Sequence, residues 1–115
     1  MKFLWPFVFL SFNAFSAECN VYGISDSPQR INCYIHQNAE LEPLSLFCKN
    51  GVYNIVWKNA RYKVEQAYHE EVERGSTPLI FQTASLSLKT ISLHIYGQAK
   101  LSTKNGSFDG ICFFK

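Results

Sequence analysis

Short apolar segments that alternate with polar residues, separated by turn residues, dominate this chain of 115 residues. The clearest boundary is Asn50-Gly51, between the alternating runs 44–48 and 52–57. Asn-Gly supplies the positive φ that both central positions of a type I′ hairpin turn require. Lys58-Asn59 has the place of a second turn, before the run 61–64. The pattern predicts a three-stranded antiparallel meander and constrains the chain to a β fold.

Further short strands are predicted on both sides of the meander. Residues 65–74 fit two alternatives: a helix without a clean apolar stripe, or a strand to about Tyr68 followed by a charged loop. The alternation changes parity near Lys89-Thr90, which predicts a bulge or turn there. The chain is therefore predicted to be all-β, a small antiparallel barrel or sandwich of roughly eight short strands. The additional predicted strands are 19–24, 31–35, 79–81, 86–88, 91–95 and 108–113.

The N-terminus has the layout of a secretory signal peptide. Lys2 precedes the apolar run 3–10, and small residues follow up to Ala17. The run is too short to cross a membrane, which takes about 20 residues. We therefore expect residues 1–17 to be removed and residues 18–115 to form a single secreted or periplasmic domain without a membrane span.

The predicted export signal indicates the chemical state of the four cysteines. An even number in an oxidising compartment predicts two disulfides rather than reactive thiols. Loop-length arguments favour Cys19–Cys33 with Cys48–Cys112, although the other two pairings stay open. No two cysteines have the C-x₂₋₄-C spacing of a structural zinc site. We therefore predict two structural disulfides and no metal ligand.

Charge and motifs exclude several classes of function. The formal net charge is +2, or +1 without Lys2, and no dense basic patch occurs, so nucleic acid is not an expected partner. The chain contains neither a G-x-S-x-G elbow nor a glycine-rich phosphate loop, so no catalytic residue and no cofactor are predicted.

One dense group of titratable side chains lies in mid-chain, at His69, Glu70, Glu71 and Glu73. On a helix His69 and Glu73 would share a face, but the second imidazole of an H-E-x-x-H zinc site is missing. A charged, solvated face is the simpler interpretation. A small secreted hydrolase that uses these carboxylates remains an alternative function.

Tyrosines are numerous enough to suggest a contact surface. Tyr53, Trp57 and Tyr62 share the expected core faces of their strands. A surface of Tyr68, Tyr96, His69, Glu70 and Glu73 is predicted instead to face a partner, as amphipathic tyrosines often do. Together these features favour a binding module rather than an enzyme, with a protein or glycan partner outside the cytoplasm.

Three segments resemble a known family. Phe47-Cys48-Lys49-Asn50-Gly51, the segment 96–101 and Cys112 are similar in outline to the periplasmic inhibitors of c-type lysozyme. Those inhibitors are small eight-stranded barrels. The spacing at Gly97-Gln98-Ala99 departs by one residue, and the Ser-Gly loop that enters the lysozyme cleft has no clear counterpart, so no functional residue is transferred. The resemblance implies a barrel and, as an alternative function, inhibition of a secreted hydrolase such as lysozyme.

Overall fold

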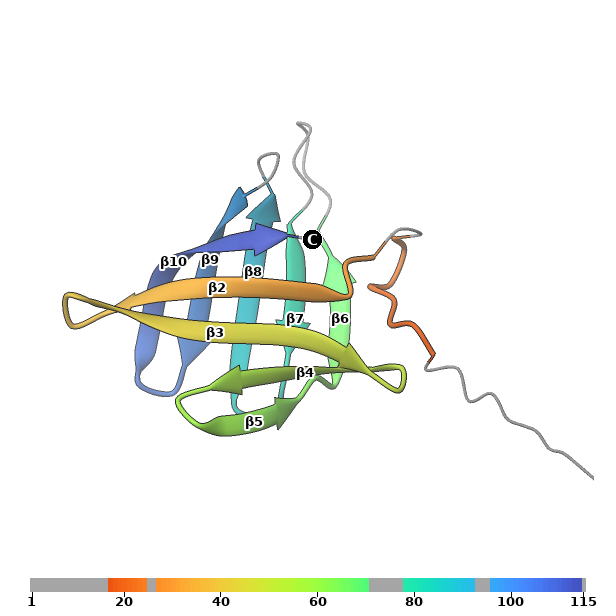
Figure 1. Cartoon of the computed structure of the whole chain (residues 1–115), viewed down its shortest axis with the longest axis horizontal. Coiled ribbons are helices and arrows are strands. Elements are labelled where there is room, and N and C mark those ends of the chain that lie inside the picture. Colours follow the sequence, from red (N-terminus) through yellow and green to blue (C-terminus); the bar gives the residue numbers. More distant parts are fainter. Residues whose placement is uncertain (1–16, 25–26, 71–77, 93–95, 115) are drawn as a thin grey trace, which may run out of the picture.

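A single antiparallel sheet of nine strands, curled into a half-barrel, forms the protein (Figure 1). The computed structural model describes residues 17–24, 27–70, 78–92 and 96–114. Residues 1–16 of the predicted signal peptide lie outside this range. The all-β prediction is confirmed. The strands are β2 (Arg30–Gln37), β3 (Glu40–Lys49), β4 (Val52–Trp57), β5 (Ala60–Lys63), β6 (Gln66–His69), β7 (Leu79–Gln82), β8 (Leu86–Ser92), β9 (Tyr96–Thr103) and β10 (Gly106–Phe114).

Alternation along the strands places the core on the concave face of the sheet. In β4, Tyr53, Ile55 and Trp57 are buried, whereas the residues between them are partly exposed. This burial confirms the sequence prediction for β4, because successive strand residues face opposite sides of a sheet. The largest fully buried side chains are Phe81, Ile31, Ile35, Leu44, Leu46, Ile55, Leu88 and Leu101.

Tight turns whose residues have a left-handed backbone conformation join the consecutive strands from β2 to β5. Asn50 and Gly51 have φ values of 54° and 81°, and Lys58 and Asn59 have values of 52° and 64°. Both predicted hairpins are therefore confirmed, and β3, β4 and β5 form the predicted meander. Asn38 also has positive φ, at 53°, in the turn between β2 and β3.

The two edges of the sheet are adjacent in the sequence. Strand order runs β5-β4-β3-β2-β10-β9-β8-β7-β6, so β5 and β6 are the edges, and only Val64 and Glu65 connect them. Val64 N donates to Tyr53 O at 2.9 Å, and Glu65 N donates to Gln82 O at 2.7 Å. The chain thus passes directly from pairing beside β4 to pairing beside β7, which brings the two edges together.

Two disulfides are present, but not in the pairing that loop lengths favoured. Cys33 of β2 lies directly opposite Cys112 of β10, with a Cα–Cα distance of 4.0 Å. Cys19 is bonded to Cys48, with a Cα–Cα distance of 5.8 Å. The favoured pairing was wrong because β2 and β10, the first and last strands in the sequence, pair with each other in the middle of the sheet. That register decides which cysteines meet.

Three other expectations are corrected or resolved. Residues 19–24 are not a strand and make only one isolated bridge, between Tyr22 and Tyr68. No bulge interrupts β8, whose register with β9 is continuous from Leu86 to Ser92. The parity change arises because Thr90 occupies a fully buried core position. Of the alternatives for residues 65–74, a strand forms over Gln66–His69, and residues 71–77 lie outside the described part.

Within the described part of the chain, no helix is long and apolar enough to cross a membrane.

Candidate ligand-binding end of the half-barrel

An N-terminal segment, residues 18–24 and 27–29, covers one end of the half-barrel and is called the strap. In Figure 1 it is the red-orange segment beside the start of β2. Cys19 and Val21 of the strap are only 2% and 1% exposed and belong to the core cluster. The disulfide to Cys48 ties the strap to the end of β3. The strap therefore closes this end, called the closed end, with apolar side chains and a covalent bond.

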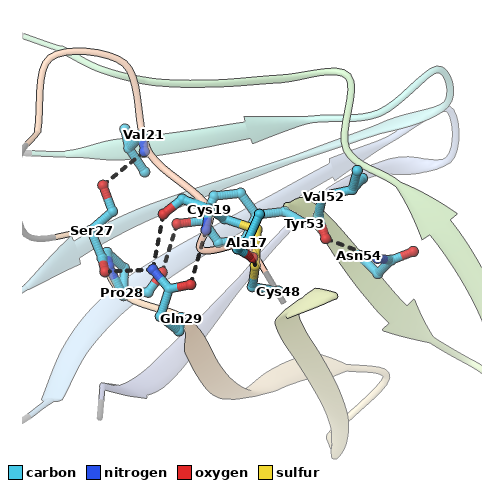
Figure 2. The surroundings of a disulfide bond; sticks show 10 residues. All are labelled: Ala17, Cys19, Val21, Ser27, Pro28, Gln29, Cys48, Val52, Tyr53 and Asn54. Carbon is cyan, nitrogen blue, oxygen red and sulfur yellow. Dashed lines mark hydrogen bonds between the residues drawn. A yellow bond between two sulfur atoms is a disulfide. The ribbon is translucent and has the colours of Figure 1, made fainter. Parts of the chain in front are cut away.

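Gln29 fastens the strap with its side-chain amide, as Figure 2 shows. Its Oε1 accepts a hydrogen bond from Cys19 N at 3.0 Å. Its Nε2 donates to Cys19 O at 2.9 Å and to Ser27 O at 3.0 Å. One side chain thus satisfies both polar groups of the Cys19 backbone, which would otherwise be desolvated beside the core.

Tyr53 connects the strap to β4. Its hydroxyl donates to Pro28 O at 2.6 Å (Figure 2). The side chain is 4% exposed, and its ring meets Phe81 edge-on, with centroids 5.1 Å apart. Burial raises the pKa of Tyr53 to about 12. The closed end therefore contains a phenol that stays protonated well above neutral pH.

His69, one of the predicted contact residues, is engaged by the strap. Its Nδ1 lies 2.8 Å from Tyr22 O. A Cβ added at Gly23 would lie 2.5 Å from the ring's Cε1, so only glycine leaves room for the imidazole there. The ring is therefore placed to hold the strap against β6.

Glu70, Tyr68 and Tyr22 lie close to His69 in the structure. Glu70 pairs with Lys89, with 3.1 Å between Oε1 and Nζ. Tyr68 is half-buried and faces a shallow groove of about 520 Å³ together with Tyr22, which is 81% exposed.

The other members of the predicted contact surface are not placed with these residues. Tyr96 opens β9, with its side chain outside the described part, and Glu73 lies in the segment 71–77 that is not described. The contact surface as a whole stays a prediction.

The opposite end of the half-barrel is open. The turns after β2, β4, β7 and β9 gather there, on the left and lower side of the sheet in Figure 1. They surround a cavity of about 300 Å³. This volume lies at the lower limit of the range for small-molecule sites, and such sites form preferentially in the mouths of β-barrels. The cavity, called the open-end cavity, is lined by Gln37, Trp57, Lys58, Tyr62, Ser85, Leu86, Thr103, Lys104, Asn105 and Phe108.

Aromatic rings form the floor and walls of the open-end cavity. Trp57 is 5% exposed and lies at its base, and Tyr62 and Phe108 are half-buried beside it. Beneath this layer Leu88 and Leu101 are fully buried, so side chains fill the interior of the half-barrel. The cavity is consequently a shallow bowl at the rim.

Positive charge marks the rim of the bowl. Lys58 and Lys104 are both exposed, and none of the described residues that line the cavity is a carboxylate. Lys58 Nζ lies 5.6 Å from the centroid of the Trp57 ring, within the range of a cation–π contact. Lys58 also has a φ of 52°, a conformation that bulky residues rarely adopt. Two lysines therefore flank an aromatic floor.

The local sequence pattern does not indicate this cavity. It predicts that Trp57 and Tyr62 belong to the core and that Lys58 is part of a turn. A usable signal was present, because alternate turns of an up-and-down meander lie at the same end of the sheet. Lys58-Asn59 and Lys104-Asn105 are two such turns, and the inward-facing aromatic residues adjoin them.

Comparisons with known proteins give no family for this chain. A scan against protein-family models finds no match, and searches of curated proteins and of solved structures find none either. The resemblance to the periplasmic inhibitors of c-type lysozyme therefore depends on the short sequence segments and on the strand pattern alone.

Proposed function

We propose that this small disulfide-bonded β domain is a secreted or periplasmic binding module that takes its ligand in the open-end cavity. The observation that carries the proposal is the contrast between the ends. The strap covers one end with buried apolar residues and a disulfide, and the other end presents an aromatic bowl of about 300 Å³. Two disulfides are consistent with an oxidising compartment.

Two members of the mid-chain group of titratable residues, His69 and Glu70, make structural contacts, and this favours binding over catalysis. A general base needs a ring nitrogen or carboxylate free to reach substrate. The Nδ1 atom of His69 contacts Tyr22 O, and Glu70 forms an ion pair with Lys89. In the hydrolase alternative His69 would act through its other ring nitrogen, Nε2, together with Glu70 and with Glu73, which lies outside the described residues.

The test is ligand capture by the oxidised protein on glycan and protein arrays and from the envelope fraction of its own source. Wild type is compared with Tyr62→Ala and Phe108→Ala, which alter the cavity wall. Tyr34→Ala is the matched control, because Tyr34 is 45% exposed on the outer surface and does not line the cavity. A ligand lost in both wall variants and kept in the control supports the proposal. Capture that is unchanged in the wall variants, or no saturable ligand at all, would overturn it.

Lysozyme inhibition is the second function to test, since a curled antiparallel sheet agrees in outline with the barrels of that inhibitor family. A c-type lysozyme activity assay with the same variants is sufficient. Inhibition at stoichiometric protein would establish this alternative, and sensitivity to Tyr62→Ala would indicate whether the open end makes the contact. Full lysozyme activity at excess protein would exclude it.

A further inference from the structure

We infer that the open-end cavity binds an acidic sugar, a pyranose ring that carries a carboxylate. The inference rests on the proposed function and assigns its ligand class. Three features of the cavity carry it: the sign of the charge at the rim, the mixture of aromatic and polar side chains, and the small depth of the bowl.

The charge at the rim selects an anion. Lys58 and Lys104 come from the turns β4–β5 and β9–β10, so they approach the bowl from two different hairpins. The single ion pair among the described residues joins Lys89 to Glu70 on another part of the sheet. Neither rim lysine is therefore neutralised by a described carboxylate. A ligand carboxylate between them would gain charge-assisted hydrogen bonds without competing with an internal partner.

The composition of the wall selects a sugar over a purely apolar anion. Tyr62 and Phe108 offer flat apolar faces, and their partial exposure leaves part of each ring accessible. Around them stand hydrogen-bonding side chains, the amides of Gln37 and Asn105 among them. A pyranose ring has both kinds of surface: apolar C–H faces that lie on aromatic rings and hydroxyls at its edge. An aliphatic or aryl acid would make no hydrogen bonds with these polar groups, whereas the hydroxyls of a sugar can.

The depth of the cavity excludes a fatty acid. A long acyl chain needs a tunnel into the barrel, as in barrels that enclose a ligand. Here Phe81, Leu88 and Leu101 fill the interior and are fully buried. The ligand must consequently lie at the rim, where a single ring and its immediate neighbours in a glycan chain can be accommodated.

The experiment compares matched acidic and neutral sugars. The probes are glucuronic acid against glucose and galacturonic acid against galactose, each as the monosaccharide and as a short oligomer. Binding is followed by isothermal calorimetry and by amide shifts of residues around the cavity in NMR spectra. The chain contains two tryptophans, Trp5 and Trp57. Trp5 lies in the predicted signal peptide, so Trp57 is the one tryptophan of residues 18–115 and its fluorescence reports on the cavity floor directly.

The charge variants decide the inference. We expect the acidic sugars to bind at least about tenfold more tightly than their neutral partners, and the Lys58→Gln/Lys104→Gln double variant to lose about tenfold for the acid only. Added salt should reduce the preference, because the lysines are exposed. Lys100→Gln is the matched control: it removes an exposed lysine that does not line the cavity, and it should change nothing. Thermal unfolding checks that each variant is folded.

The failure of this inference can be distinguished from the failure of the proposed function. Equal binding of acidic and neutral sugars, or binding indifferent to the two lysines, would overturn the acidic-sugar inference and leave an open-end ligand in place. The same holds if no sugar binds while the arrays yield another ligand that the wall variants abolish. If no probe and no array ligand depends on the cavity, both proposals are wrong.

Discussion

The two ends of the half-barrel are built by different means. At the closed end a disulfide and the Tyr53 hydroxyl join the strap to strands that are distant in the sequence, and the Gln29 amide holds the two parts of the strap together. At the open end the chain turns back locally, through hairpins such as the one at Lys58-Asn59, and no long-range hydrogen bond of a lining side chain is found among the described residues. Polar groups are satisfied internally at one end and are left accessible at the other.

This difference separates stability from binding. Substitutions at the closed end break contacts between distant segments and should therefore lower the free energy of unfolding. Substitutions at the rim of the open end should alter ligand affinity with small effects on stability.

The largest expected effect comes from the disulfide that joins the first and last strands. Cys33→Ala/Cys112→Ala opens a loop with a sequence separation of 79. In the chain-entropy model its loss costs about 4.5 kcal/mol, and a domain of this size has a total stability of only about 5–15 kcal/mol. Urea unfolding measures the change. A variant as stable as wild type would show that the strand pairing alone closes the sheet.

The strap disulfide provides the matched comparison. Cys19→Ala/Cys48→Ala opens a separation of 29, for which the same model gives about 3.5 kcal/mol. Below its unfolding temperature this variant should keep its ligand at the open end, because the strap lies at the other end. Loss of binding in the folded variant would show that the two ends are coupled.

Alkaline pH should destabilise the protein through Tyr53. Its pKa is raised by burial from 10.0 to about 12, so the unfolded chain loses this proton at lower pH than the folded chain does. The contribution to stability is fully present below about pH 10 and is lost as the pH rises toward 12, by about 2–3 kcal/mol. Unfolding free energies measured from pH 8 to pH 11.5 give the slope.

Two phenylalanine variants isolate that slope. Tyr53→Phe should be about 1 kcal/mol less stable at neutral pH, because the bond to Pro28 O is lost, and should decline less steeply above pH 10. Tyr34→Phe, at an exposed position, should decline as wild type does. If Tyr53→Phe declines as steeply as wild type, another group controls the alkaline transition.

Gln29 tests the strap without touching a disulfide. Gln29→Ala removes one accepted and two donated hydrogen bonds and leaves the Cys19 backbone groups unpaired. We expect a loss of about 2 kcal/mol, with the disulfide intact. Gln98→Ala, an exposed glutamine on β9, is the control and should change stability by less than about 0.5 kcal/mol. Equal stabilities of the two variants would mean that solvent replaces the strap bonds.

The local residue pattern was sufficient to predict the hairpins. It was insufficient to predict features that depend on which distant strands pair in the sheet. Asn50-Gly51 and Lys58-Asn59 could be placed because turn geometry is decided by the residues of the turn. The cysteine pairing could not be chosen, because Cys33 meets Cys112 only through the register of β10 on β2. Nothing near either cysteine encodes that register.

The candidate site was hidden for a related reason. Trp57 and Phe108 belong to β4 and β10, which are not adjacent in the sheet, and each looks locally like an ordinary core residue. Thr90 shows the converse: a polar residue occupies a fully buried position and so imitates a break in the strand. Side-chain alternation predicts which face a residue occupies, but which faces surround a cavity depends on the curl of the whole sheet.

The smallest predicted effect has the opposite sign and lies at the open end. Lys58 holds a left-handed φ of 52°, which costs a residue with a side chain about 1 kcal/mol and which asparagine tolerates better. Lys58→Asn also loses the contact with the Trp57 ring, which is worth about 0.5 kcal/mol at an exposed site. The balance is a gain of about 0.5 kcal/mol. Thermal unfolding should therefore show a slightly more stable protein that binds an acidic sugar more weakly.

Asn59→Gly separates backbone conformation from charge at the same turn. Asn59 has a φ of 64°, and Asn or Gly suits this position, so the variant should keep or slightly raise stability and leave binding intact. A Lys58→Asn variant less stable than wild type would show that the lysine is retained for its contact with Trp57. A more stable variant with weakened binding would mean that the strained Lys58 favours ligand binding and destabilises the fold. The contacts between the strap and the sheet at the closed end have the opposite role, since they stabilise the fold.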